Sequence, residues 1–290
     1  MKDVPITVVY LARCAEGAPS VQRFLAAYRL HPAGVNHRLL IAAKGWDTAS
    51  SKELLATIVG GIGAEVRHLP DDGFDLGAYR RILPECAGHH VVFLNTHSEP
   101  LVPNWLSLMV RHAAPGRLLG ATASWNSHRP DRLTAYPSWK PLKPRFRSRL
   151  WRAWLGFREA WADLGGYNAF PNPHVRTNGF LLPPELHHLV LSWSIPEDKH
   201  ACYRLESGLS GLSAQVLASG GTLWCAGADG RLHAVEQWPA AGIFCSQRQQ
   251  HLIIADNQTR DYSVATPDRQ RLLHWYTWRS FPGCDIDTQV

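Results

Sequence analysis

Polar side chains that can bind a ligand or move a proton stand at four places, each directly after an apolar run of the sequence. These places are Ala12-Arg13, residues 71–77, residues 95–99 and Trp125-Asn126. In an open parallel sheet, ligands bind beyond the carboxyl ends of the strands. If each apolar run is such a strand, the four places meet at one edge of the sheet, and we expect the functional site there.

Residues 71–77 offer the richest chemistry of the four. They contain Asp71, Asp72, Asp75 and two glycines, and a helix is predicted to follow with Tyr79 in its first turn. Carboxylate oxygens can accept hydrogen bonds from ribose hydroxyls, and free backbone N–H groups can bind phosphate. The competing interpretation is that Asp75 only caps the helix, which is a common role for aspartate.

The alternation of apolar runs with helix-period segments predicts the elements that hold these side chains. It is typical of βαβ units, so the predicted fold class is α/β, with a mainly parallel sheet flanked by helices. Gly60 to Gly63 follows a helix and precedes a strand, the reverse of a phosphate loop, and is interpreted as a helix end. We predict strands at 6–11, 38–43, 65–69, 90–95, 118–124, 177–182 and 222–226, and helices at about 20–30, 51–59, 77–86, 105–113, 184–193 and 207–218.

Composition excludes several classes of protein. The 290 residues are 45% apolar, enough to bury a large core, and the net charge is +6. Residues 129–158 hold nine Lys or Arg and one Asp, so the rest of the chain is slightly acidic, unlike a nucleic-acid binder. We expect no signal sequence, because the first residues lack its pattern, and no apolar run is long enough to cross a bilayer. Together these observations predict a cytoplasmic protein. The scattered cysteines favour reduced thiols.

Residues 126–173 interrupt the regular pattern with a basic, aromatic excursion. Within it, residues 145–161 interleave Arg145, Arg147, Arg149 and Arg152 with tryptophans and other apolar residues at helical spacing. This composition is typical of a helix lying at an anionic membrane surface, and we predict contact with the inner face of the membrane. The alternative is an amphipathic helix packed on the protein's own core.

The order of several short motifs along the chain resembles that of bacterial glycosyltransferases with the GT-A fold, similar to the family 2 and rhamnan-synthesis-type enzymes. Each motif is short, but together they extend over nearly the whole chain. The matching segments are Gly73-Phe74-Asp75-Leu76-Gly77-Ala78-Tyr79, Phe93-Leu94-Asn95, Arg176-Thr177-Asn178-Gly179-Phe180, Glu206-Ser207-Gly208-Leu209-Ser210 and Ala255-Asp256-Asn257-Gln258-Thr259-Arg260.

The resemblance implies a single domain over residues 1–290. Residues 1–125 would bind the nucleotide-sugar donor, residues 126–173 would form the excursion, and residues 174–290 would bind the acceptor. The residues implied to bind the nucleotide-sugar are Ala12, Arg13, Asp75, Gly77, Tyr79, Asn95, Thr96, His97 and Asn178.

The chain departs from the family where two aspartates would bind a divalent metal on the donor diphosphate. It has Asn95 and His97 there, and hard divalent cations prefer carboxylate oxygens. We therefore expect no required metal cofactor, with nearby arginines or helix N-termini balancing the diphosphate charge. If Mg²⁺ or Mn²⁺ does bind, the expected ligands are His97 and Glu99.

Two carboxylates are candidates for catalysis. The resemblance implies that Glu206 removes the proton of the acceptor hydroxyl, although the usual position of that base is one residue later, at Ser207. The alternative is that Glu206 stabilises the start of a helix. Asp256 lies in a segment that is predicted either to fold over the donor as a lid or to form a capped turn.

The sequence thus predicts a glycosyltransferase that moves a sugar from a nucleotide diphosphate to a saccharide or lipid-linked acceptor in bacterial surface polysaccharide biosynthesis. The alternative is a protein of the same fold that binds a saccharide or nucleotide without turnover. A nucleotidyltransferase is disfavoured, because the segment after the first strand, Ala12 to Gly17, has too little glycine. No nucleic-acid partner is expected.

Overall fold

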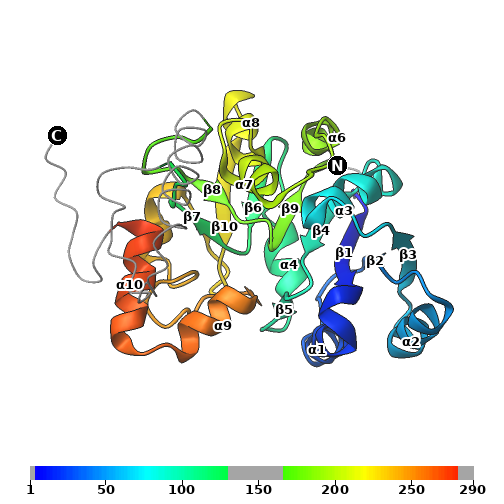
Figure 1. Cartoon of the computed structure of the whole chain (residues 1–290). Helices are drawn as coiled ribbons and strands as arrows, with labels where there is room; N and C mark the ends of the chain where they lie inside the picture. Colours follow the sequence, from blue (N-terminus) through cyan, green and yellow to red (C-terminus); the bar gives the residue numbers. More distant parts are fainter. Residues whose placement is uncertain (1–3, 130–165, 280–290) are drawn as a thin grey trace, which may run out of the picture.

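The computed structural model describes residues 4–129 and 166–279, and its centre is an eight-stranded sheet (Figure 1). All of these strands run parallel except β9 and β11. The α/β class predicted from the sequence is confirmed. From one edge to the other the strands are β11 (Leu232–His233), β10 (Thr222–Ala226), β6 (Arg117–Gly120), β9 (Gly179–Leu182), β4 (His90–Leu94), β1 (Ile6–Arg13), β2 (Arg38–Lys44) and β3 (Glu65–Leu69).

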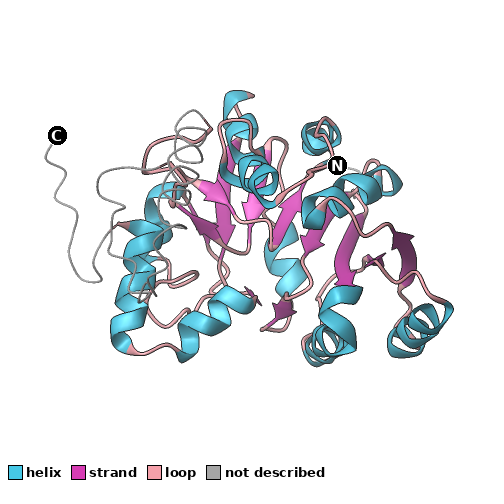
Figure 2. Cartoon of the chain, viewed as in Figure 1, coloured by secondary structure: helices cyan, strands magenta, loops and turns pink. Residues whose placement is uncertain are grey.

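The inner strands are apolar on both faces because helices cover both sides of the sheet (Figure 2). In β1, Val8 and Tyr10 pack toward α1 (Gly17–Leu30), α2 (Ala49–Val59) and α4 (Trp105–Val110). Val9 and Leu11 pack toward α3 (Phe74–Ile82), α6 (His187–Leu191) and α8 (Leu212–Ala218). Burying such a side chain stabilises the fold by about 1.5–3 kcal/mol. Because successive side chains of a strand point to opposite faces, this energy fixes the face of the sheet on which each residue packs.

Strand β9 sits between β4 and β6 and is antiparallel to both. Its first residue, Gly179, pairs with Leu94, the last residue of β4. The residues just before β9 therefore lie at the carboxyl edge of the parallel strands. A backbone hydrogen bond of 3.0 Å from Asn95 N to Asn178 O joins the two segments.

Two short strand pairs and two helices extend this edge. Strand β5 (Glu99–Pro100) pairs with β12 (Ile254–Ala255), and β7 (Ala123–Ser124) pairs with β8 (His174–Val175). Helices α9 (Asn257–Val264) and α10 (Pro267–Trp278) follow, and α10 lies at the opposite end of the molecule from α2 (Figure 1). Four 3₁₀ turns complete the described elements: η1 (Cys14–Glu16), η2 (Leu83–Cys86), η3 (Pro184–Leu186) and η4 (Val235–Ala240).

The largest difference from the sequence prediction lies around Glu206. The helix predicted at 207–218 begins only at Leu212, as α8, and a helix that was not predicted, α7 (Lys199–Ser207), precedes it. Asp198 caps α7 by accepting a hydrogen bond of 2.7 Å from Ala201 N, a signal that the sequence analysis missed. The chain turns between them at Gly208, where a Cβ atom would lie 2.6 Å from the Arg204 carbonyl oxygen.

The bounds of other helices and strands also differ from the predicted ones. The predicted strand 118–124 is broken into β6 and β7, and the helix predicted from 77 begins at Phe74. The Gly60 prediction is confirmed, since α2 ends at Val59 with Gly60 as its C-cap. The proposed membrane segment 145–161 lies outside the described residues. Among the helices that the structure describes, none has the length and hydropathy needed to cross a membrane.

Candidate active site

The carboxyl ends of β1 and β2 open into a cavity of about 620 Å³, here called the Lys44 cavity. Basic and acidic groups face each other across it, and the segment before α7 closes one side. Its lining includes Arg13, Lys44, Asp71, Asp72, Phe74 and Ile195. This is the edge at which the sequence predicted ligand binding.

Lys44 is a buried cation that the sequence analysis did not single out. It ends β2, is only 2% exposed, and its Nζ lies 3.4 Å from Oδ1 of the half-exposed Asp71. Arg13 is its register partner on β1, and the Arg13 Nε is buried without a hydrogen-bond partner among the described residues. A buried cation with one long ion pair is suited to an anionic ligand. Arg13 beside it is partly exposed, and its Nη1 lies 3.8 Å from Glu16 Oε1. The signal in the sequence that could have indicated Lys44 is a lysine at the end of an apolar strand.

Asp75 does not cap its helix. The N-cap of α3 is Gly73, with a φ of 68°, and no side chain caps this end. The Asp75 carboxylate accepts no hydrogen bond within the described residues. Burial raises the pKa of Asp75, while Arg13, Lys44 and His97 act in the opposite direction. The charge of Glu206 also acts to raise the pKa of Asp75, so the two carboxylates interact electrostatically.

The turn after β4 holds its own polar groups in place. The Asn95 Oδ1 accepts hydrogen bonds of 3.0 Å from both His97 N and Ser98 Oγ. Thr96 is buried, and its carbonyl oxygen accepts a bond of 2.9 Å from the Tyr10 hydroxyl. His97 is partly exposed, with Nε2 3.9 Å from Glu16 Oε2. Of these residues, His97 is the one whose charge acts on the pKa of Asp75, which it lowers.

Glu99 does not fit the metal-ligand role expected of it. Its Oε1 lies 2.5 Å from Arg260 Nη1 and 2.9 Å from Arg23 Nε, so two guanidinium groups already bind this oxygen. A cation beside them would be repelled. Within residues 4–129 and 166–279, no cluster of three or more His, Cys, Asp or Glu side chains has an arrangement that could hold a metal ion.

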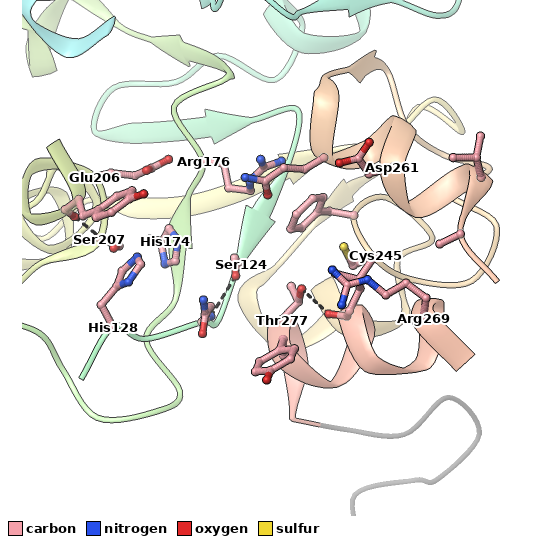
Figure 3. Close-up of a pocket in the computed structure, with 18 residues that line it drawn as sticks. Ser124, His128, His174, Arg176, Glu206, Ser207, Cys245, Asp261, Arg269 and Thr277 are labelled. Atoms are coloured by element: carbon pink, nitrogen blue, oxygen red, sulfur yellow. Dashed lines mark hydrogen bonds between the residues drawn. The ribbon is translucent and has the colours of Figure 1, made fainter. Parts of the chain in front are cut away.

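A second and larger cavity, about 740 Å³, is lined by Glu206 and is here called the Glu206 cavity. In Figure 3, Glu206, His174 and His128 lie on one side of it, and Asp261, Arg269 and Thr277 lie on the other. Aromatic rings line it as well: Tyr203, Phe244 and Tyr276. The His128 ring stacks on Tyr203 at a centroid distance of 4.7 Å.

Glu206 is held in the last turn of α7, so the alternative that it stabilises a helix start is wrong. A carboxylate at a helix C-terminus gains nothing from the helix dipole. Instead, its Oε1 accepts bonds of 2.9 Å from both the backbone N and the hydroxyl of Thr177. Its Oε2 has no hydrogen bond among the described residues, and the side chain lines the cavity.

Asp256 has no free oxygen for catalysis. It is fully buried and caps α9, with Oδ1 accepting a 2.8 Å bond from Thr259 N. Its Oδ2 binds Arg176 Nη2 at 2.8 Å, and the Arg176 guanidinium stacks 4.0 Å above the Phe244 ring. Of the two interpretations of this segment, the capped turn is the observed one. Asp256 therefore positions Arg176 at the cavity wall.

The other predicted binding residues serve the scaffold. Ala12 is buried, and its carbonyl oxygen accepts a 3.0 Å bond from Trp46 Nε1. Gly77 packs beside Ile195. Tyr79 is fully buried against Phe93. Its hydroxyl donates to the Thr177 carbonyl oxygen at 3.3 Å, so Tyr79 supports the residue that holds Glu206.

Asn178 is only 4% exposed and belongs to a buried chain of hydrogen bonds. Arg176 Nη1 donates to the Thr122 hydroxyl, which donates in turn to Asn178 Oδ1 at 2.9 Å. Because arginine can only donate, this order fixes the Asn178 amide with Nδ2 pointing away from Thr122. No described residue accepts a bond from that Nδ2.

Comparison with known proteins found distant structural likenesses alone. No family model and no curated protein matches the chain. HddC from Yersinia pseudotuberculosis, solved with GMP-PN, is 8% identical with a TM-score of 0.36, over 66% of this chain and 81% of HddC. The galactosyltransferase LgtC, solved with donor and acceptor sugar analogs, is 11% identical with a TM-score of 0.35, over 69% and 70%. The inositol-1-phosphate CTP transferase from T. maritima is 10% identical with a TM-score of 0.39, over 78% and 86%. These likenesses are too distant to indicate an activity.

Proposed function

We propose that this chain is a glycosyltransferase that moves a sugar from a nucleotide diphosphate donor to a saccharide or lipid-linked acceptor in bacterial surface polysaccharide biosynthesis. The observation that supports this most strongly is the pair of cavities at one edge of the sheet. Asp75 is within electrostatic range of Arg13 and Lys44 on one side and of Glu206 on the other. A group-transfer reaction between two substrates needs two binding sites, one for the donor and one for the acceptor.

The Lys44 cavity is the proposed donor site. Lys44 and Arg13 supply two positive charges at the ends of adjacent strands, where they would balance a diphosphate. Asp75, with an unpaired carboxylate, would accept hydrogen bonds from ribose hydroxyls. Because these two cations already supply compensating charge, the reaction is proposed to need no metal cofactor.

The Glu206 cavity is the proposed acceptor site. Its aromatic rings can stack on the C–H faces of a pyranose, and its polar groups can fix the sugar's orientation. Glu206 supplies negative charge next to the place where an acceptor hydroxyl loses its proton. The chain is further proposed to act as a single domain on the cytoplasmic face of the membrane, with contact through residues 145–161.

Turnover with a donor panel tests this function. Purified full-length protein would be incubated with UDP-, GDP- and dTDP-sugars, with and without saccharide acceptors, and release of nucleoside diphosphate measured. We expect one donor class to be consumed. Nucleotide binding without any turnover would favour the non-catalytic alternative, and the absence of nucleotide binding would refute both.

The donor site has its own test in Lys44→Met. This change removes the buried charge but keeps the side chain's length and apolar stem, so the fold should persist. We expect nucleoside diphosphate affinity, measured by calorimetry, to fall at least about tenfold. The matched control is Lys52→Met, which removes an exposed charge on α2 and should bind as the wild type does. Equal affinity in Lys44→Met and wild type would remove Lys44 from the donor site.

A further inference from the structure

His174 is a buried histidine whose ring faces the Glu206 cavity. It lies on β8, where it pairs with Ser124 of β7, and it is 8% exposed. Its side chain is on the same side of the cavity as Glu206 (Figure 3). Sequence analysis did not single out this histidine, because no metal-ligand spacing or catalytic motif surrounds it.

One ring nitrogen of His174 has its protonation set by the backbone. Nδ1 lies 2.8 Å from the Asn172 carbonyl oxygen, and a carbonyl oxygen can only accept, so Nδ1 carries the hydrogen. In the neutral ring, the lone pair is then on Nε2. Asn172 is itself 3% exposed and donates a 2.7 Å bond to the Ser207 carbonyl oxygen, next to Glu206. Within the described part of the chain, no residue forms a hydrogen bond with Nε2.

Burial and neighbouring charges together determine the pKa of the His174 ring. Burial lowers the pKa of His174 from its ordinary value, against the opposing effects of Glu206 and of the bond to Asn172. Arg176 and His128 lower it further. The net effect favours the neutral ring. The nearby Glu206 carboxylate can stabilise the imidazolium that forms when the ring takes up a proton.

We propose that Nε2 of His174 accepts the proton of the acceptor hydroxyl, and that the Glu206 carboxylate favours the imidazolium that results. This inference rests on the proposed glycosyl transfer. As the hydroxyl oxygen forms its bond to the anomeric carbon, the proton passes to Nε2 and the bond from that carbon to the diphosphate oxygen breaks. The nucleoside diphosphate leaves with that electron pair. His174 and Glu206 thus divide between them the role that the sequence assigned to Glu206 alone.

His174→Asn tests this assignment in the turnover reaction. The asparagine amide can still donate to the Asn172 carbonyl oxygen from the δ position, while Nε2 is lost. We expect kcat to fall roughly 10²- to 10⁴-fold with little change in donor KM. The control is His188→Asn, an exposed histidine whose Nδ1 likewise lies 2.8 Å from a backbone carbonyl oxygen, that of Glu185. Wild-type kcat in His174→Asn would overturn the proposal.

The pH profile separates His174 from Glu206 as the proton acceptor. Activity of the wild type should rise with pH through a pKa below 6.5, because the ring must be neutral to accept a proton. This limb should be absent from the residual activity of His174→Asn and retained in Glu206→Gln. A limb that is lost in Glu206→Gln but kept in His174→Asn would make Glu206 the acceptor and overturn the proposal.

Nitrogen NMR of ¹⁵N-histidine-labelled protein gives a readout that does not need turnover. With His174 assigned by its loss in His174→Asn, we expect the Nδ1–H tautomer and a pKa below 6.5. The Nε2–H tautomer would overturn the proposal even in an active enzyme. Wild-type protein that turns over no donor would refute the proposed function and the catalytic role with it, while the NMR spectra would still show whether the ring has the expected form.

Discussion

Arg13 and Lys44 end neighbouring strands, Asp75 lies in the first turn of α3, and none of the three side chains is fully paired. The Asp75 carboxylate has no hydrogen-bond donor within the described residues, and Lys44 has one ion pair, at 3.4 Å. Residues held in this way lose little when a ligand binds, because no strong internal bond must first be broken. This makes single substitutions informative.

Asp75→Ala is expected to weaken nucleotide binding at least tenfold, about 1.4 kcal/mol, because a contact from a carboxylate to a ribose or base would be lost. Calorimetry on folded protein measures this directly. The control is Asp268→Ala, a highly exposed aspartate whose surface ion pair with Arg271 contributes little to stability. Unchanged affinity in Asp75→Ala would exclude Asp75 from the binding site.

Glu206→Gln is expected to keep the fold and the donor affinity while kcat falls by roughly 10²- to 10⁴-fold. The amide oxygen can still accept both bonds from Thr177, so only the negative charge is removed. Steady-state kinetics beside Glu236→Gln, an exposed residue, would measure the effect. A rate close to that of the wild type would remove Glu206 from the mechanism.

At the scale of elements, ion pairs between side chains hold the turn after β4 in place. Arg23 of α1 and Arg260 of α9 both bind Glu99 of β5, so three elements distant in sequence are tied together there. Arg260 Nη1 also donates to the His97 carbonyl oxygen at 3.1 Å. The segment from Asn95 to Glu99 is therefore held by its own hydrogen bonds and by two guanidinium groups.

Chelation tests whether this turn needs a metal. We expect most of the activity to survive EDTA, because Asn95 is committed to the turn, Glu99 is committed to arginines, and Lys44 and Arg13 supply positive charge for the diphosphate. Initial rates with and without EDTA, on the donor found in the panel, measure this. Complete loss of activity that Mn²⁺ or Mg²⁺ restores would show that His97 or a more distant carboxylate binds an ion.

At the scale of the whole molecule, β9 brings the two cavities to one edge. Because β9 runs antiparallel between β4 and β6, its N-terminal end lies among the carboxyl ends of its neighbours. Arg176, Thr177 and Asn178 are thereby placed at that edge, and Thr177 holds Glu206. A parallel strand at this position would have carried these residues to the opposite edge of the sheet.

The global stability of the protein should reflect the burial of Asp75. The pKa of Asp75 is raised in the folded state. Its contribution to the free energy of unfolding is therefore most favourable below the unfolded pKa, about 3.9, and is lost as the pH rises through the folded pKa. Asp75→Asn should therefore have a higher Tm than the wild type at pH 7, with the difference narrowing as the pH falls through that raised pKa. Thermal unfolding at a series of pH values, with Asp268→Asn as the exposed control, measures this. A lower Tm in Asp75→Asn at pH 7 would mean that Arg13 and Lys44 more than offset the cost of burial.

The sequence by itself determined most of the strands of the main sheet and the edge at which several of its polar residues gather. Apolar runs and turn residues act over a few neighbouring positions, so β3 and β10 were predicted at their observed bounds, and Arg13 and Asp75 were placed at the correct edge. The order of the strands and the roles of the polar residues depend on contacts between distant positions. Thr177 and Glu206 are 29 residues apart, and Arg176 and Asp256 are 80 apart.

Only the tertiary structure could therefore decide which carboxylates are available for ligand binding or catalysis. It buried Asp256 against Arg176, removed Asp75 from the capping role and placed Glu206 at the end of a helix rather than at its start. It also left Lys44 inside a cavity and aimed His174 at another. A local pattern gives the type of a side chain and the element that carries it. Burial, pairing and direction come from the segments packed around it, and those are set by the fold as a whole.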